Sequence, residues 1–473
     1  MDVLRLPVAG PLLRWRYIRQ ALQLVMLAIV AVVVLHGLFG PQIAPRNLAT
    51  VLTSIHWRGL LVIGVLGVGN LFCTSCPMIL ARDAGRRIFH ARLPWPRRLR
   101  GKWLGLGLLV LALFSYELFD LWAQPRATAW LILGYFGLAI AVDLIFKGAA
   151  FCKHVCPVGQ FNFVASTLAP AELQVRDRQT CVGCRTSDCI RGRRDVAQPL
   201  RVIRRGCELG LFLPSKVGNL DCTLCLDCVH ACPHDNIALT TRVPGMELTG
   251  DTRRSGIGRL PRRSDIAALA IVFTFAALLN AFAMTAPAVA LERTLAAVLH
   301  VRSEAPVLAL LFLAGLVIVP AGLLGGATFL SRVLATPVAG RAPSALRYAY
   351  ALVPLGFGVW LAHYGFHLLT GLFTLLPVAQ SAAIDVWTWP VLGEPNWRWA
   401  GMRPGAVYPL QLGFVLLGAL GSLGLVHATS RSDTPRRPNA AAMPWLLVVI
   451  LLAIAALWIL AQPMEMRGLG GIG

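Results

Sequence analysis

The sequence predicts a mainly α-helical membrane protein with about nine spans and a smaller α+β segment inserted between two groups of helices. The 473 residues are 56% hydrophobic and only 14% charged, with a mean hydropathy of +0.66, which is typical of a protein that lies in a bilayer. Apolar runs of spanning length recur along the chain. Between the fourth and the fifth run lies a long polar stretch that is rich in cysteine and arginine.

A membrane-spanning helix needs about 20 predominantly apolar residues. The sequence contains nine such runs, at residues 20–39, 58–79, 103–121, 129–146, 265–286, 306–328, 348–376, 408–427 and 444–462. The first run is too long for the apolar core of a signal peptide, so we expect a retained helix. The runs predict a four-helix membrane domain over residues 1–146, a polar domain over 147–263 and a five-helix membrane domain over 264–473.

The positions of the basic residues predict the orientation. The chain has 44 Lys and Arg against 22 Asp and Glu, a net charge of +22. If the N-terminus is cytoplasmic, 36 of the 44 fall on the cytoplasmic side and 7 on the other, as the positive-inside rule requires. The excess of charge then reflects topology, and no nucleic-acid partner is expected. We expect a multi-pass protein of the bacterial cytoplasmic membrane, with the N-terminus and residues 147–263 in the cytoplasm.

The twelve cysteines point to metal ligation, because eleven of them lie in compact groups that suit soft-metal binding better than disulfides. The motif CTLCLDCVHACP at residues 222–233 places Cys222, Cys225, Cys228 and Cys232 at the C-x2-C-x2-C-x3-C-P spacing. This is the run of bacterial two-cluster ferredoxins, in which three cysteines hold one [4Fe–4S] cluster and the fourth reaches a second. Zinc or unligated thiols are the alternatives.

A second set of ligands is expected upstream. CVGCRTSDC supplies Cys181, Cys184 and Cys189, although its last gap is four residues instead of two. Cys207 is the remaining candidate for a fourth ligand, with a buried structural cysteine as the alternative. If the clusters exchange ligands as in ferredoxins, one is held by Cys181, Cys184, Cys189 and Cys232, and the other by Cys207, Cys222, Cys225 and Cys228.

Two similar motifs follow apolar runs, FCTSCP at residues 72–77 and FCKHVCP at 151–157. Their repetition suggests an internal duplication. The four thiols are expected to converge at the membrane surface, where they could hold a third cluster or a metal, act as a redox dithiol, or carry no metal at all. They belong to Cys73, Cys76, Cys152 and Cys156.

The paired membrane-edge motifs, followed by a cysteine-rich polar segment, resemble the NapH/NosR-type membrane polyferredoxins over residues 58–240. The resemblance implies [4Fe–4S] ligation at the eight cysteines between 181 and 232. It also implies a redox role for Cys73, Cys76, Cys152 and Cys156, and electron exchange between the quinone pool and a partner. The relaxed CVGCRTSDC pattern departs from the usual run. The C-terminal half resembles FesM, a photosynthesis-associated membrane iron–sulfur protein, more weakly.

Ionisable groups inside apolar runs are functional candidates because their burial in lipid is costly. His363 and His367 lie four residues apart, on one face of the seventh run, and Glu117 lies near the end of the third. They could contact a quinone headgroup or carry protons, and hydrogen bonding between helices is the alternative. Haem is not expected, because no second mid-membrane histidine is evident on another helix.

These features predict a membrane-bound iron–sulfur protein that passes electrons between the quinone pool and a cytosolic or membrane redox partner through two [4Fe–4S] clusters. Such a protein would be a component of a quinol or quinone oxidoreductase. The alternatives are an accessory protein for the maturation of a metalloenzyme and a redox sensor.

Overall fold

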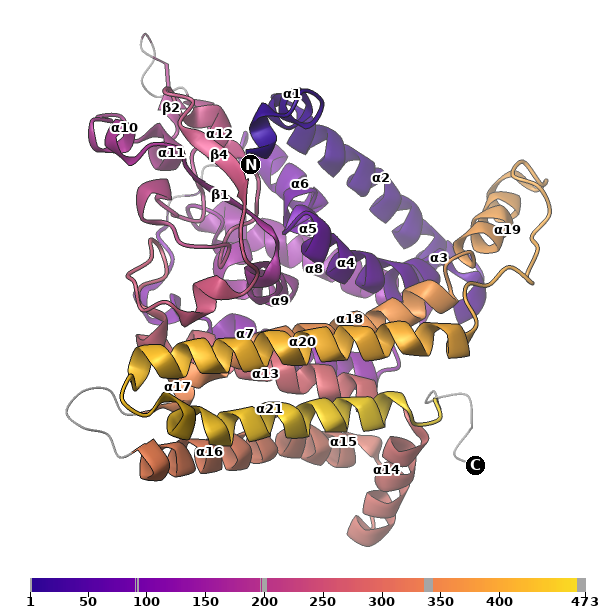
Figure 1. Cartoon of the computed structure of the whole chain (residues 1–473). Helices are drawn as coiled ribbons and strands as arrows, with labels where there is room; N and C mark the ends of the chain where they lie inside the picture. The colour runs from indigo at the N-terminus through magenta and orange to yellow at the C-terminus, as the bar shows by residue number, and fades with distance from the viewer. Residues whose placement is uncertain are drawn as a thin grey trace. The chain divides into compact units, whose positions relative to one another are not determined.

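The computed structural model describes residues 2–465, except residues 90, 92, 196, 198–201 and 336–342. The chain is mainly helical, with two small antiparallel sheets (Figure 1). Four of the basic residues counted for the orientation, Arg92, Arg201, Arg341 and Arg467, lie outside the described residues. The expectation of a mainly helical membrane protein is confirmed by the apolar helices.

Within the described residues, eight helical segments are long and apolar enough to cross a membrane. They are Ile18–Phe39 (α2), Leu48–Gly67 (α3 and α4 with a π-helical turn between them), Pro125–Ile145 (α8), Ser264–Phe282 (α13), Glu304–Ala335 (α15 and α16), Ala345–Thr370 (α17 and α18), Pro404–Asp433 (α20) and Pro438–Leu460 (α21). This is one fewer than the nine expected, and the remaining run forms a shorter apolar helix, Trp103–Leu118 (α7).

The third expected span is the one that falls short. Helix α7 covers Trp103–Leu118, which is 16 residues and shorter than the roughly 20 of a typical span. The chain leaves the helix at Asp120, whose φ of 43° lies in the left-handed region and cannot continue a right-handed helix.

The second expected span is displaced towards the N-terminus. It begins at Leu48 because Asn47 caps the helix, accepting a 2.9 Å hydrogen bond from the Ala49 amide. It ends at Gly67, just before Gly69 takes a φ of +97°. The FCTSCP motif therefore lies after this helix and not within its last turns.

The chain divides into two compact units that do not follow chain order. The first unit contains residues Met1–Val30, Gly64–Leu109 and Gly134–Asp265, and the second contains Ala31–Ile63, Val110–Leu133 and Ile266–Gly473. The three consecutive domains expected from the sequence stay a prediction.

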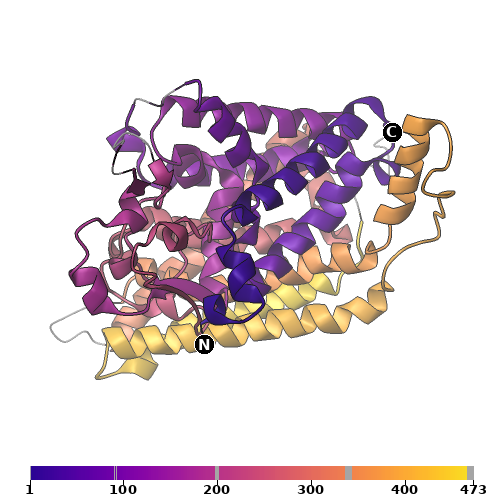
Figure 2. The same cartoon turned by 90° about the horizontal axis from the view of Figure 1, so that it is seen from above.

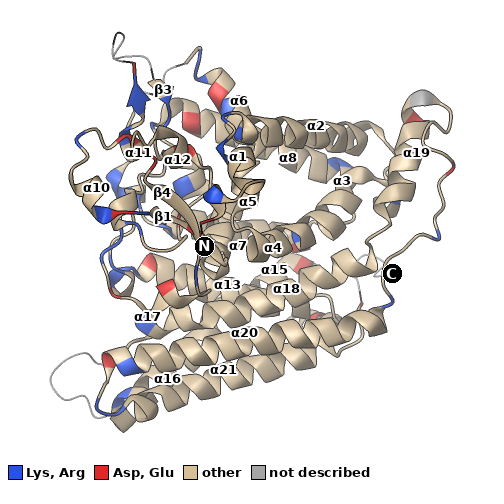
Figure 3. Cartoon of the chain, turned by 45° about the horizontal axis from the view of Figure 1, so that its top comes forward, with Lys and Arg blue, Asp and Glu red and all other residues tan. Residues whose placement is uncertain are grey.

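The first unit contains all twelve cysteines. Strand β1 (Ala171–Val175) pairs antiparallel with β4 (Ile237–Thr241), and β2 (Arg193–Arg194) pairs with β3 (Val202–Arg204). The short helices α10 (Arg178–Val182), α11 (Asp188–Arg191) and α12 (Asp227–Ala231) lie beside the strands (Figure 1). The other helices of this unit are α1 (Ala9–Arg14), α5 (Leu71–Thr74), α6 (Pro77–Gly85) and α9 (Pro157–Ala165). Lys and Arg surround β3, α10 and α11 (Figure 3).

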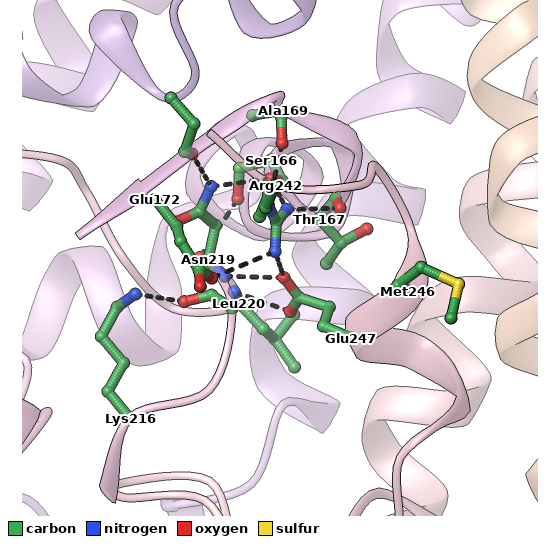
Figure 4. Close-up of polar contacts among 12 residues, drawn as sticks. Ser166, Thr167, Ala169, Glu172, Lys216, Asn219, Leu220, Arg242, Met246 and Glu247 are labelled. Atoms are coloured by element: carbon green, nitrogen blue, oxygen red, sulfur yellow. Dashed lines mark hydrogen bonds and ion pairs between the residues drawn. The ribbon is translucent and has the colours of Figure 1, made fainter. Parts of the chain in front are cut away.

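Arg242 connects the end of β4 to the chain before the CTLCLDC loop (Figure 4). Its guanidinium donates to the carbonyls of Ala169 (2.9 Å) and Ser166 (3.0 Å) and pairs with Glu247. Glu247 in turn accepts hydrogen bonds from the amides of Asn219 (2.7 Å) and Leu220 (3.3 Å). A buried ion pair with all its hydrogen bonds made fixes one geometry, so the start of the loop is held in place.

The second unit is built on closely packed apolar helices, with α14 (Ala286–Leu299) and α19 (Leu375–Trp387) as additional helices. Helices α20 and α21 run side by side in two views (Figures 1 and 2), and α18 packs along α20. The contact of α18 with α20 depends on glycine. A Cβ at Gly418 would lie 2.6 Å from the Pro354 carbonyl oxygen, and small residues of this kind allow membrane helices to approach closely.

Substitution of Gly418 by Ala should therefore destabilise the protein by about 1–3 kcal/mol, because the new methyl group overpacks this contact. Gly413→Ala is the matched control on the same helix, since a Cβ there meets nothing within 4 Å. Thermal unfolding in detergent would measure both. Equal melting temperatures for the two variants would contradict the packing described here.

Candidate functional site

The loop that carries Cys222, Cys225 and Cys228 has an unusual backbone. Asp221, Leu224 and Leu226 have φ values of 61°, 53° and 62°, although residues other than glycine rarely adopt the left-handed region. Such residues cluster at binding sites, where the surrounding structure maintains the strain. The alternating turns let the loop wrap around a central space before α12 begins at Asp227.

Cys207 joins the three cysteines of this loop around one cavity. The cavity is lined by Cys207, Cys222, Cys225 and Cys228, with leucines from β1 and the 209–213 segment as the apolar remainder. The amide of Leu211 donates to the Cys207 sulfur at 3.4 Å. Burial raises the pKa of the Cys207 thiol and raises those of Cys225 and Cys228 well above the ordinary value.

A second cavity is lined by the other four cysteines of the segment, Cys181, Cys184, Cys189 and Cys232. Asn236 donates two hydrogen bonds to these cysteines. Its side-chain amide donates to the Cys181 sulfur (3.3 Å), and its backbone amide donates to the Cys232 sulfur (3.4 Å). Burial raises the pKa of Cys189 to about 11. The Ser187 amide and the Thr186 hydroxyl lower that of Cys184.

The two groups of four have the same members as the two sets expected from ligand exchange between clusters. The donor set also fits the expected group, because four thiols around one cavity are what a [4Fe–4S] cluster uses. Within the described residues, no three His, Cys, Asp or Glu side chains are placed to hold a single metal ion. Ligation itself stays a prediction, as does the likeness of the segment to a ferredoxin.

The two membrane-edge motifs have matching local structures. Cys76 and Cys156 are each the N-cap of a helix whose first residue is proline, α6 and α9 respectively, and proline is favoured at that position. The Cys156 sulfur accepts from the Gly159 amide (3.0 Å) and lies 2.7 Å from the Tyr135 hydroxyl.

The four membrane-edge thiols lie within electrostatic reach of one another. Burial, then the neighbouring Cys156 and Cys76, raise the pKa of Cys73, and burial raises that of Cys156 to about 12. The pKa of Cys152 is also raised, mainly by burial and then by the neighbouring Cys156, Asp143 and Cys76. The structure therefore brings Cys73, Cys76, Cys152 and Cys156 together, as their repeated motifs suggest.

Asn70 links the membrane-edge thiols to the loop thiols. Its side-chain oxygen accepts from the Cys73 amide at 3.4 Å, and its side-chain nitrogen donates to the Cys222 carbonyl at 3.1 Å. Thr74 adds a parallel bond from its hydroxyl to the Thr223 carbonyl at 2.7 Å. All of these groups are buried, so the two hydrogen bonds hold the backbones of the two motifs side by side.

Three cations, two of them buried and one partly exposed, accompany the thiols, and the sequence analysis did not assign them to the site. Arg19 pairs with Asp227, and its charge acts on both Cys225 and Cys76. Arg82 is 1% exposed and forms ion pairs with Asp83 (2.8 Å) and Glu208 (2.8 Å).

Lys102 is the third cation, and its Nζ lies 2.5 Å from Asp221, the residue before Cys222. In the sequence, Arg19, Arg82 and Lys102 stand out only by their positions beside apolar runs. Such positions indicate topology determinants and not a role at the thiols.

The remaining candidates lie in the second unit. The rings of His363 and His367 meet edge to face with centroids 5.0 Å apart. Glu117 accepts a hydrogen bond from the Asn280 side chain at 3.1 Å. His363 and Glu117 line different cavities, so the structure brings the two histidines together and places Glu117 elsewhere.

Lys102→Met should lower the free energy of unfolding by about 3–5 kcal/mol, because it leaves the buried Asp221 carboxylate without its partner. The double variant Lys102→Met/Asp221→Asn should recover most of this loss. Arg293→Met breaks an exposed pair with Glu465 and should cost less than about 1 kcal/mol. Thermal unfolding of the full-length protein would test all three, and a Lys102→Met variant as stable as the parent would refute the pairing.

Comparison with known proteins finds two relatives with the same description. The chain is 28% identical over 195 residues to the ferredoxin-type protein NapH of Escherichia coli, a match that covers 38% of this chain and 65% of that protein. It is 26% identical over 230 residues to the ferredoxin-type protein NapH of Haemophilus influenzae, covering 42% of this chain and 72% of that protein. The chain thus spans about two thirds of the length of these relatives.

No protein-family profile and no solved structure matches the chain. The FesM-like resemblance of the C-terminal half stays a prediction. The eight apolar helices and the NapH similarity fit a bacterial inner-membrane protein. The two relatives confirm the resemblance to NapH-type proteins that was predicted from the cysteine motifs.

Proposed function

We propose that this protein is a membrane-bound iron–sulfur electron carrier with two [4Fe–4S] clusters that exchanges electrons between the quinone pool and a protein redox partner. The observation that carries the proposal is the grouping of eight cysteines around two cavities, four to each. The ferredoxin-type description of the two relatives agrees with it. Cys181, Cys184, Cys189 and Cys232 would hold one cluster, and Cys207, Cys222, Cys225 and Cys228 the other.

Bound clusters would supply one-electron redox chemistry at potentials set by nearby charge, hydrogen bonds and exposure to solvent. The chain's own residues supply those influences. Arg19 places a positive charge near Cys225, and the amides of Leu211 and Asn236 donate to the sulfurs of Cys207 and Cys232. Each of these contacts stabilises negative charge on sulfur and thus favours the reduced state.

The membrane-edge thiols would form a third redox centre in this proposal. Their raised pKa values keep them protonated at neutral pH when no cation is bound, and buried protonated thiols are poor nucleophiles. In place of free dithiol exchange, we propose a third cluster, whose irons would bind the thiolates of Cys73, Cys76, Cys152 and Cys156. The Asn70 bridge places this group beside Cys222.

The proposed orientation puts the N-terminus and residues 147–263 in the cytoplasm. The positive-inside bias supports it, and so does a direct contact within the first unit. Asp2 accepts hydrogen bonds from the Leu239 amide (3.2 Å) and from Arg176 (2.9 Å). The N-terminus thus lies on the segment that carries the loop cysteines, as two parts on one side of a membrane can do.

Iron and acid-labile sulfide analysis of anaerobically purified protein tests the number of clusters. Two clusters give about eight irons per chain, and a third gives about twelve, since each cluster contains four. Cys184→Ser and Cys225→Ser should each remove about four irons, because they change different cavities. Cys73→Ser/Cys152→Ser should lower the total only if a third cluster is present. An iron-free wild-type protein that is fully active would refute the proposal.

Replacement of Arg19 by Met should lower the midpoint potential of one cluster by tens of millivolts, because it removes a positive charge near Cys225. Arg19→Lys retains the charge and should retain most of the potential. Arg293→Met, at an exposed pair, serves as the control. Redox titration followed by visible absorbance would measure the shift, and identical potentials in the Met variant and the parent would exclude this role for Arg19.

A further inference from the structure

A cavity of about 570 Å³ lies within the second unit. It is bounded by the C-terminal end of α13, the middle of α18, the first turns of α20 and the C-terminal end of α21. Its volume falls in the range of small-molecule binding sites, about 300–1,000 Å³. Most of its wall is apolar, with Ala281, Met284, Phe366 and Ile459 among the lining residues.

His363 is the buried polar side chain at this cavity. It is 4% exposed, and its Nε2 has no hydrogen-bond partner within the part of the chain that the structure describes. Gln411 lines the same cavity and is 6% exposed, and its amide donates to the Ala362 carbonyl at 3.3 Å. A buried polar nitrogen without a partner costs about 1–3 kcal/mol. The site therefore favours an occupant that offers a hydrogen-bonding group to His363.

The chemistry of the wall selects among possible occupants. A lipid acyl chain matches the apolar residues but leaves the imidazole nitrogen unsatisfied. Water satisfies the nitrogen but not the apolar wall. A quinone ring has both features, since its flat body is apolar, its carbonyl oxygens accept hydrogen bonds, and its quinol hydroxyls donate them. A neutral imidazole can act as donor or acceptor according to its tautomer, so His363 suits either redox state.

We infer that this cavity binds the ring of a membrane quinone, with the His363 imidazole in its wall as the hydrogen-bonding partner of one of its oxygens. The inference rests on the proposed function and gives its quinone a site. Phe366 and Met284 line the apolar wall on which the ring would lie. His367, whose ring contacts that of His363 edge to face, acts as a positioning residue.

The cavity at Glu117 cannot take this role. It is bounded by Glu117, Asn280, Glu292 and apolar side chains, and its volume is about 20 Å³, which is enough for a water molecule but not for a ring. Glu117, which the sequence analysis grouped with His363 and His367, therefore lines a different cavity from His363.

The test uses a short-tailed benzoquinone that carries a photoreactive azido group, bound to the full-length protein in detergent. Mass spectrometry should find the label on peptides from α18 and the start of α20. Competition with the unlabelled quinone gives the affinity. His363→Leu should weaken binding about threefold to tenfold, as expected for the loss of one hydrogen bond. His363→Gln, which can still form a bond, should restore most of it.

Two further variants keep the result interpretable. Ala281→Trp fills the cavity without altering His363 and should abolish labelling. His427→Leu is the matched control, because His427 does not line this cavity, and it should leave the affinity unchanged. The inference is overturned by labelling at other helices, by unchanged affinity in a folded His363→Leu protein, or by a cavity that retains only phospholipid.

Iron analysis of the same preparations separates this inference from the proposed function. A wild-type protein with eight irons that the quinone probe labels only at other helices would remove the cavity assignment alone. An iron-free protein whose quinone binding requires His363 would keep the cavity assignment and remove the iron–sulfur proposal.

Discussion

The hydrogen bonds of Asn70 form the contact on which the arrangement of the thiols depends. The Asn70 side chain accepts a hydrogen bond from the Cys73 amide and donates one to the Cys222 carbonyl. A membrane-edge motif and a loop motif separated by about 150 residues are therefore joined through one buried side chain. Both polar ends of the side chain are satisfied, and a fully satisfied buried amide specifies a single geometry. A shift at Asn70 would move both groups of cysteines at once.

Burial of so many thiols imposes an electrostatic constraint, because taking thiolates out of water disfavours their charged form. The chain places three cations near the thiols, the buried Arg82 and Lys102 and the partly exposed Arg19, and each of them is paired with a carboxylate. Two of these carboxylates, Asp221 and Glu208, are immediate neighbours of Cys222 and Cys207. The proposed cluster ligands and the ion pairs therefore lie in the same short segments, so a change in one is expected to affect the other.

Much of the architecture could be predicted from the sequence, because hydrophobic runs and cysteine spacing are local signals. The spans near residues 20–39 and 444–462 and the grouping of the eight cysteines follow from such signals. The starts and ends of helices depend on single residues instead. Asn47 begins the second span early, and Asp120 stops α7 before it reaches spanning length. The roles of Arg19 and Lys102 depend on partners more than 100 residues away, which no local pattern indicates.

The central claim is that the two four-cysteine cavities hold [4Fe–4S] clusters close to one another. Electron paramagnetic resonance of the anaerobically reduced, full-length protein tests it most directly. We expect signals of reduced [4Fe–4S] clusters that are broadened by magnetic interaction between two centres, and a single unbroadened signal in a Cys184→Ser variant. A reduced, folded protein that shows no iron–sulfur signal at any temperature would contradict the account.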